Sequence, residues 1–157
     1  MKTQFLKTTV AGVAIAASLF ATGAMAQEYQ WTFQTSAQAG DNFFPIEEAW
    51  ADRVNELSDG RIEITVVPVG TVVAHNETLD AVDAGILQGH ITDPSYFSGK
   101  DPAFAMLGNL VGAWSAPEQM FDYMENGGGK ELFNGLVNPY GLQFLGASAT
   151  GVEAFLS

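Results

Sequence analysis

Two histidines and two acids are the residues of this chain best suited to metal or acid–base chemistry. His75, Glu77 and Asp80 are spaced as on one turn of a helix, and His90 follows at the next predicted strand. A metalloprotease helix carries two histidines four residues apart, and that pattern is absent from the sequence. One hypothesis is therefore a secreted, acidic, metal-dependent hydrolase that uses these four residues. The alternative is a capped helix start that faces solvent.

A serine motif and a lysine motif also fail on spacing. Ser148 lies in GASAT (146–150), which nearly matches the nucleophile turn of α/β-hydrolases, but Thr150 replaces the second glycine. No histidine follows Ser148 to act as its base. GGGKE (127–131) lacks the four-residue spacer after its first glycine and the Ser or Thr after its lysine that a phosphate loop needs. The sequence therefore predicts no catalytic residue.

The other polar candidates follow predicted strands. Ser36, Asp93, Tyr96 and Glu153 each come after a strand, and in open α/β sheets ligands bind beyond the carboxyl ends of the strands. Turn capping is an equal alternative for Ser36 and Asp93. Tyr96 suits a pocket wall, because its ring is apolar and its hydroxyl is polar.

The hydrophobic pattern predicts the elements that would position these residues. Apolar residues alternate in the strands and recur every three or four residues in the helices, for example at Phe43, Ile46, Trp50, Val54 and Leu57. Asn76 is the predicted cap of the second helix. Helices between strands favour a parallel α/β sheet that is covered on both faces. The predicted strands are 29–36, 61–68, 88–92 and 141–148, and the predicted helices are 42–58, 77–87, 115–126 and 130–138.

Residues 1–26 have the pattern of a secretory signal peptide. Lys2 and Lys7 precede an uncharged apolar run, and Ala24 and Ala26 stand before the expected cleavage point. The apolar run is shorter than the roughly 20 residues that a membrane helix needs, so stable membrane insertion is not expected. The chain has no cysteine, so no disulfide stabilises it. Export without cysteine fits a bacterial periplasm.

Charge excludes another class of partner. The formal net charge is −12, and only Arg53, Arg61, Lys100 and Lys130 are basic after the leader, against 18 acidic residues. Four scattered cations cannot form the basic patch that nucleic acid or an anionic membrane would bind.

Three stretches together resemble a known family. WADRVNELSDGRIEITVVPVGTV (50–72), ETLDAVDAGIL (77–87) and YFSGKDPAFA (96–105) resemble the TRAP-type extracytoplasmic solute receptors, the periplasmic binding subunits of ATP-independent transporters. The resemblance runs from residue 29 to residue 157. GKDPAFA (99–105) and GGGKELF (127–133) are similar to the branch that takes α-keto acids, lactate or similar monocarboxylates.

The resemblance implies a periplasmic-binding-protein-like α/β fold of two lobes around a cleft. Residues 27–150 would form the first lobe, and 151–157 would begin the crossover to a second lobe, which makes the chain an N-terminal fragment. Such a receptor is not an enzyme: it closes on a small organic acid by hinge motion and then docks on membrane permease subunits. A stand-alone, single-domain binding module that ends at Ser157 is the other alternative.

The resemblance also assigns site residues. Ser36, Asp93 and Tyr96 fall where relatives present first-lobe groups to the ligand. Glu153 falls at the crossover position, where some relatives carry an arginine and others a glutamine that helps to hold a cation. An acid there favours a ligand-associated cation, sodium or calcium, with Glu153 as its ligand. The family's carboxylate-clamping arginine has no counterpart, because Arg53 and Arg61 lie elsewhere on the predicted elements.

Overall fold

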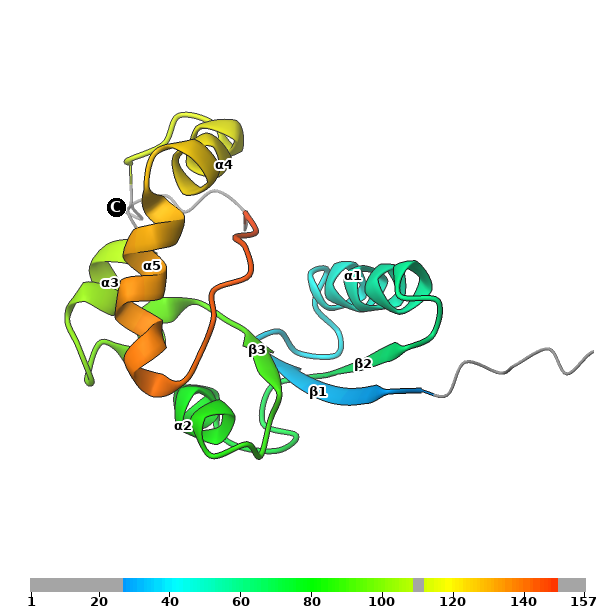
Figure 1. The fold of residues 1–157 in the computed structure, drawn as a ribbon. Coiled ribbons are helices and arrows are strands. Elements are labelled where there is room, and N and C mark those ends of the chain that lie inside the picture. Colours follow the sequence, from blue (N-terminus) through cyan, green and yellow to red (C-terminus); the bar gives the residue numbers. More distant parts are fainter. Residues whose placement is uncertain (1–26, 109–111, 150–157) are drawn as a thin grey trace, which may run out of the picture.

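Three parallel strands organise the first half of the chain. The computed structural model describes residues 27–108 and 112–149, so the predicted leader and Glu153 lie outside the described residues. The strands are β1 (Tyr29–Thr35), β2 (Ile62–Val67) and β3 (Gly89–Ile91), in the order β2-β1-β3 (Figure 1). Both pairings are parallel. The predicted parallel α/β layout is confirmed for these three strands.

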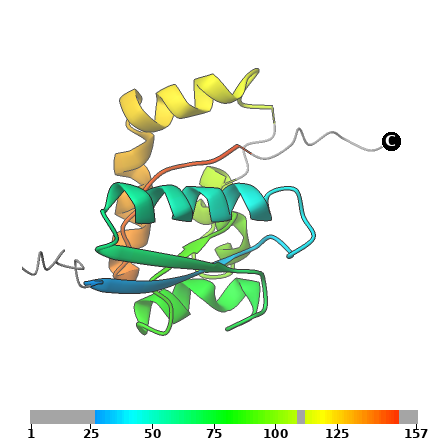
Figure 2. The ribbon, with the colours of Figure 1, turned by 90° about the vertical axis from the view of Figure 1, so that its right-hand side faces the viewer.

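Helix α1 (Phe44–Leu57) covers one face of the sheet, while α2 (Thr78–Asp83) lies on the other side (Figure 2). Phe44 and Ala51 are the residues that α1 buries. Both belong to a first core cluster, which α1 and the strands form together. It consists of Phe33, Ala37, Phe44, Ala51, Ile64 and Val66.

The predicted apolar face of α1 is wrong for most of its members. Ile46 is 64% exposed and Leu57 is 67% exposed, and Phe43 and Trp50 are also exposed. Of that set, Val54 packs against the first core cluster, and the Trp50 ring contacts the Phe33 ring at 5.7 Å between centroids while staying 38% exposed. The residues that α1 buries are Phe44 and the small Ala51 instead.

The outer edge of β2 is covered by a side chain of α1. The Oδ1 atom of Asn55 accepts a hydrogen bond from the Ile64 N–H at 2.7 Å, and its Nδ2 donates to the Ile64 carbonyl at 3.3 Å. Ser58 at the end of the helix accepts a hydrogen bond from the Ile62 N–H at 3.1 Å. Side chains thus satisfy backbone groups that a further strand would otherwise pair.

A second core cluster belongs to the helical half. The helices of this half are α3 (Ala103–Gly108), α4 (Pro117–Asn126) and α5 (Gly129–Val137). Three short 3₁₀ helices flank the elements: η1 (His75–Glu77) precedes α2, η2 (Pro94–Phe97) lies between β3 and α3, and η3 (Asn138–Tyr140) follows α5. Helices α3, α4 and α5 form a group apart from α1 (Figure 1). The second core cluster joins these three helices to α2 and η2. It consists of Leu79, Phe97, Phe104, Met124, Phe133 and Val137. Helix α3 was not predicted from the sequence.

The predicted fourth strand, 141–148, is not a strand in the structure. This segment instead packs along α5, where the Phe144 N–H donates to the Asn134 Oδ1 at 2.9 Å and the Phe144 ring stacks on Phe133. Its alternating apolar residues are therefore held by helix side chains rather than by a neighbouring strand. In the described part of the chain, no helix is long and apolar enough to cross a membrane.

Candidate functional site

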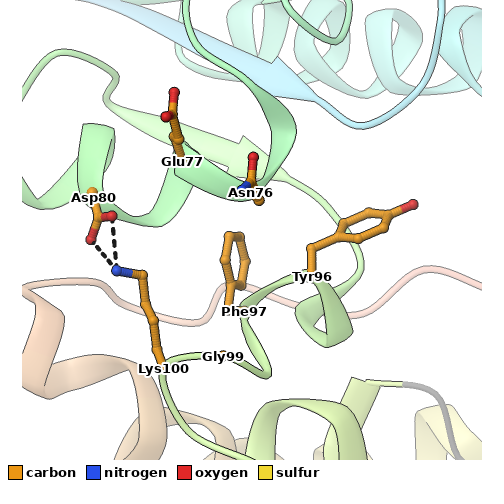
Figure 3. Close-up of a pocket in the computed structure, with 7 residues that line it drawn as sticks. All are labelled: Asn76, Glu77, Asp80, Tyr96, Phe97, Gly99 and Lys100. Atoms are coloured by element: carbon orange, nitrogen blue, oxygen red, sulfur yellow. Dashed lines mark hydrogen bonds and ion pairs between the residues drawn. The ribbon is translucent and has the colours of Figure 1, made fainter.

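An open slot lies near the carboxyl ends of the strands, between η1 with α2 on one side and η2 on the other (Figure 3). Its volume is about 280 Å³. Parallel strands direct their following loops to one edge, which is where α/β folds place ligands. The slot is lined by Asn76, Glu77, Asp80, Tyr96, Phe97, Gly99 and Lys100.

The loop that leads into η1 is fixed by one buried side chain of the central strand. Gln34 in β1 has no exposed surface. Its Oε1 accepts hydrogen bonds from the N–H groups of Val72 at 2.8 Å and Val73 at 3.1 Å, and its Nε2 donates to the Val73 carbonyl at 2.7 Å. Gln34 lies on the side of β1 opposite Phe33, and there it is buried under the β2–α2 loop.

His90 in β3, which is largely but not fully buried, supports the start of α2. The Thr78 hydroxyl donates its single hydrogen to the His75 carbonyl at 3.0 Å, so toward His90 it acts as an acceptor. The Nδ1 of His90 lies 2.9 Å from that hydroxyl and therefore carries the proton. Burial lowers the pKa of His90 to about 4. His90 is thus a neutral structural group, stacked on Phe97.

The ring of Tyr96 in η2 contacts the ring of His75 in η1. Their ring centroids are 4.5 Å apart in an edge-on arrangement, and Tyr96 is 45% exposed. The Tyr96 hydroxyl and the Glu77 carboxylate point away from each other (Figure 3). The prediction that Asn76 caps the helix is wrong, because Glu77 is the residue at the N-cap position before α2, and no side chain makes a capping hydrogen bond there. The Thr78 hydroxyl closes this turn instead.

An ion pair joins the two sides of the slot. The Nζ of Lys100, which follows η2, lies 2.7 and 2.8 Å from the two carboxylate oxygens of Asp80 in α2. The hydrogen bond to Asp80 is the main cause that raises the pKa of Lys100. With Glu77 beside this pair, the slot has a net negative charge.

The predicted site residues divide among different roles. Tyr96 lines the slot. Asp93 caps η2 by accepting the Ser95 N–H at 2.7 Å, the geometry of the turn-capping alternative. Ser36 directly follows β1, and its N–H bonds the Ile91 carbonyl at 2.9 Å, which places it beside β3. Ligand contact by Ser36, Asp93, Tyr96 and Glu153 stays a prediction.

The residues of the hydrolase hypothesis are held by different partners. His75 packs on Tyr96, His90 bonds Thr78, and Asp80 bonds Lys100. Within residues 27–108 and 112–149, no group of three or more His, Cys, Asp or Glu is arranged to hold a metal ion.

Sequence reasoning missed two buried oxygen atoms near the same edge. In the described residues, Glu47 Oε2 and Thr92 Oγ1 are buried without a hydrogen-bond partner. Burial is the main cause that raises the pKa of Glu47; the Thr35 side chain lowers this pKa in part, and nearby Asp41 raises it further. The spacing of Glu47 from Phe44 and Ala51, three and four residues, is the pattern that would have placed it on the inner face of α1.

Comparison with known proteins gives a consistent result. Residues 33–157 match the sequence model of the family described as bacterial extracellular solute-binding protein, family 7. The chain is 29% identical over 124 residues to a monocarboxylate 2-oxoacid-binding periplasmic protein from Nostoc sp., covering 79% of this chain and 34% of that protein.

Two solved structures support the match. A TRAP periplasmic solute-binding protein from Rhodobacter sphaeroides, in an apo open state, is 55% identical with a TM-score of 0.73, covering 74% of this chain and 37% of that one. A second, from Pseudoalteromonas atlantica with bound sodium and pyruvate, is 28% identical with a TM-score of 0.61, covering 73% of this chain and 35% of that one. The chain thus spans about a third of the length of these relatives.

Proposed function

The chain belongs to the bacterial extracellular solute-binding proteins of family 7, and from this we propose that it contributes the first lobe of a periplasmic receptor for a small monocarboxylate. The family consists of solute-binding receptors rather than enzymes. The ligand class is a 2-oxo acid such as pyruvate, or a related acid such as lactate. Residues 27–150 form the first lobe in this proposal, and 151–157 begin the crossover.

One observation carries the ligand class. The Nostoc relative is named for binding monocarboxylate 2-oxo acids, and the Pseudoalteromonas structure contains bound sodium and pyruvate. By this analogy, Tyr96 and Ser36 present the first-lobe wall of the cleft. In this proposal Asp93 and Glu153 also contact the ligand, and Glu153 is a ligand of the accompanying cation.

Charge gives a physical reason for the cation. Arg53 pairs with Glu56 on α1, Arg61 pairs with Glu28 near the start of β1, and Lys100 is engaged by Asp80. A carboxylate that enters this negative slot would therefore be repelled unless a positive charge accompanies it. Sodium or calcium, which take carboxylate and carbonyl oxygens as ligands, would supply that charge. Lobe closure would then present the loaded receptor to membrane permease subunits of a TRAP transporter.

Calorimetry tests the proposal on the protein translated from the complete open reading frame, with the leader removed. Pyruvate and lactate are titrated after chelation, and again with sodium or calcium added. We expect saturable binding of at least one acid, strengthened by a cation, and weakened about tenfold, or about 1.4 kcal/mol, by Tyr96→Ala. Arg53→Ala on α1 is the matched control and should bind as the wild type does. Absence of saturable binding to every acid under all three ionic conditions would contradict the proposal.

A further inference from the structure

The ion pair between Lys100 and Asp80 connects two segments that are 20 residues apart in the chain. Both contacts to the carboxylate are short, 2.7 and 2.8 Å, so the ammonium group is held by both oxygens. The two side chains lie at one end of the slot, and Tyr96 lies at the other (Figure 3).

Stability alone is a weak reason for this pair. The Asp80 side chain is 59% exposed and the Lys100 side chain is 31% exposed. Ion pairs this accessible contribute little to folding, because water screens the attraction and two long side chains lose freedom. The pair nevertheless joins two separate segments and engages both carboxylate oxygens. It therefore fixes how the segments lie relative to each other, even though it adds little to stability.

The pair acts on η2 through a short and rigid connection. The Lys100 N–H bonds the Phe97 carbonyl at 2.8 Å, and the Phe97 side chain is buried in the second core cluster. Asp93 fixes the other end of η2 by accepting the Ser95 N–H. Tyr96 lies between these two attachments, so its place relative to α2 depends on both.

His75, on the opposite side, is fixed independently. Thr78 holds its carbonyl, and Gln34 holds the loop just before it. The edge-on contact between the His75 and Tyr96 rings therefore depends on how closely η2 approaches α2. Asp80 and Lys100 bridge that same gap on its exposed side.

We propose that Asp80 and Lys100 are a positioning pair that holds η2 against α2 and so keeps Tyr96 packed on His75 as a preformed wall of the ligand site. Both side chains line the slot, but a direct effect of their charges on an anionic ligand would have opposite signs in Lys100→Met and Asp80→Asn, whereas loss of positioning weakens binding in both. The role of the wall rests on the proposed function, whereas the positioning of Tyr96 is a property of the structure itself. Because the pair is exposed to solvent, raised ionic strength should loosen the wall in the same way as a substitution does.

Three variants of the complete-reading-frame protein test the pair. Lys100→Met and Asp80→Asn each remove one charge while nearly keeping side-chain size, and Asp80→Lys with Lys100→Asp exchanges the charges. Arg53→Met is the matched control, since it breaks an exposed ion pair with Glu56 on α1. The measurements are the nuclear Overhauser effect between the rings of His75 and Tyr96, the pyruvate Kd and the thermal midpoint.

We expect each single variant to weaken the ring-to-ring Overhauser effect at least twofold and to raise the Kd about fivefold, or about 1 kcal/mol. The thermal midpoint should change little. The charge-exchanged variant should recover most of both signals, and Arg53→Met should change neither.

An undiminished Overhauser effect in Lys100→Met and Asp80→Asn overturns the proposal, and so does an equal loss in Arg53→Met. If the wild type binds pyruvate, an unchanged pyruvate Kd in both single variants also overturns the proposal. If the wild type binds none of the acids, the proposed function fails, while the Overhauser effect still decides whether the pair positions Tyr96.

Discussion

The two faces of the sheet are stabilised by different kinds of contact. On the α1 face, Phe33, Ile64 and Val66 pack against Phe44 and Ala51 in an apolar cluster. The opposite face carries Gln34 in β1 and, in register beside it, His90 in β3. These polar side chains are buried and hydrogen-bonded to the loop and helix that border the slot.

The difference shows how this fold separates support from positioning. Apolar packing is nearly non-directional, so it stabilises the layers without fixing a loop at one angle. Hydrogen bonds are directional and costly to leave unmade when buried. The site-forming segments are accordingly held by polar side chains, and the three predictions below test this contrast from the largest expected effect to the smallest.

The largest effect is expected at Gln34. Replacing it with Ala leaves two N–H groups and one carbonyl of Val72 and Val73 without their partner. These hydrogen bonds are partly buried, so water replaces some of the lost partners. At about 1–3 kcal/mol for each group left unpaired, we expect the free energy of unfolding to fall by about 4 kcal/mol. Urea unfolding measures the loss, and amide exchange at Val72 and Val73 shows where it arises.

Gln30→Ala is the control on the same face of the same strand, because Gln30 is exposed and bonds only Gln27 among the described side chains. It should change the free energy of unfolding by less than about 0.5 kcal/mol. Equal losses in the two variants would show that the buried carboxamide has no special role.

A smaller, pH-dependent effect is expected at His90. Its pKa is about 4 in the folded protein against an ordinary 6.5, so between these values the unfolded chain binds the proton and the folded chain does not. The neutral imidazole therefore contributes no penalty above pH 6.5, and stability declines as the pH falls toward 4. The full difference is about 3 kcal/mol.

Urea unfolding at pH 7, 5 and 4 measures this decline against His90→Gln, which removes the titrating group. The wild type should lose about 3 kcal/mol more than the variant over this range, once the carboxylates common to both are subtracted. Parallel pH profiles for the two proteins would refute the assignment of His90 as a buried neutral group.

The smallest effect concerns the polar exception on the α1 face, Glu47. Burial raises its pKa, so folding disfavours the ionised carboxylate, and stability falls as the pH rises through the folded pKa. Glu47→Gln should therefore raise the thermal stability at pH 7. Because Glu47 is only partly buried, the gain should stay below about 1 kcal/mol.

Glu48→Gln, at the exposed neighbouring position, is the matched control for this change. Thermal unfolding of both variants at pH 4 and pH 7 measures the difference, and at pH 7 Glu47→Gln should gain more stability than Glu48→Gln does. A loss of stability in Glu47→Gln at pH 7 would contradict a destabilising carboxylate.

Periodicity predicted the scaffold well where elements are long or strongly alternating. The three strands and most helices lie within a few residues of their predicted bounds. The pattern of α1 predicted the wrong buried face, because hydrophobicity alone ranks Ile46 and Leu57 above Ala51 as core residues. The geometry of packing a helix on a sheet selected the small residue instead.

The candidate site was harder to read, because its shape depends on long-range partners. Tyr96 was recognisable as an aromatic residue in a loop after a strand, and it lines the slot. Gln34 was not recognisable, since its partners Val72 and Val73 are distant in sequence. The segment 141–148 alternates like a strand, but Asn134 and Phe133 engage it from α5. Local pattern cannot choose between such partners.

Asn55 has a consequence for the behaviour of the protein in a crowded compartment. β2 is an outer strand of the sheet, and an open outer strand is a template on which another chain can add its own strand. By engaging both backbone groups of Ile64, the Asn55 carboxamide removes one docking point for such a strand. A single amide on α1 thus closes one point of this edge to strand addition, a role separate from ligand recognition.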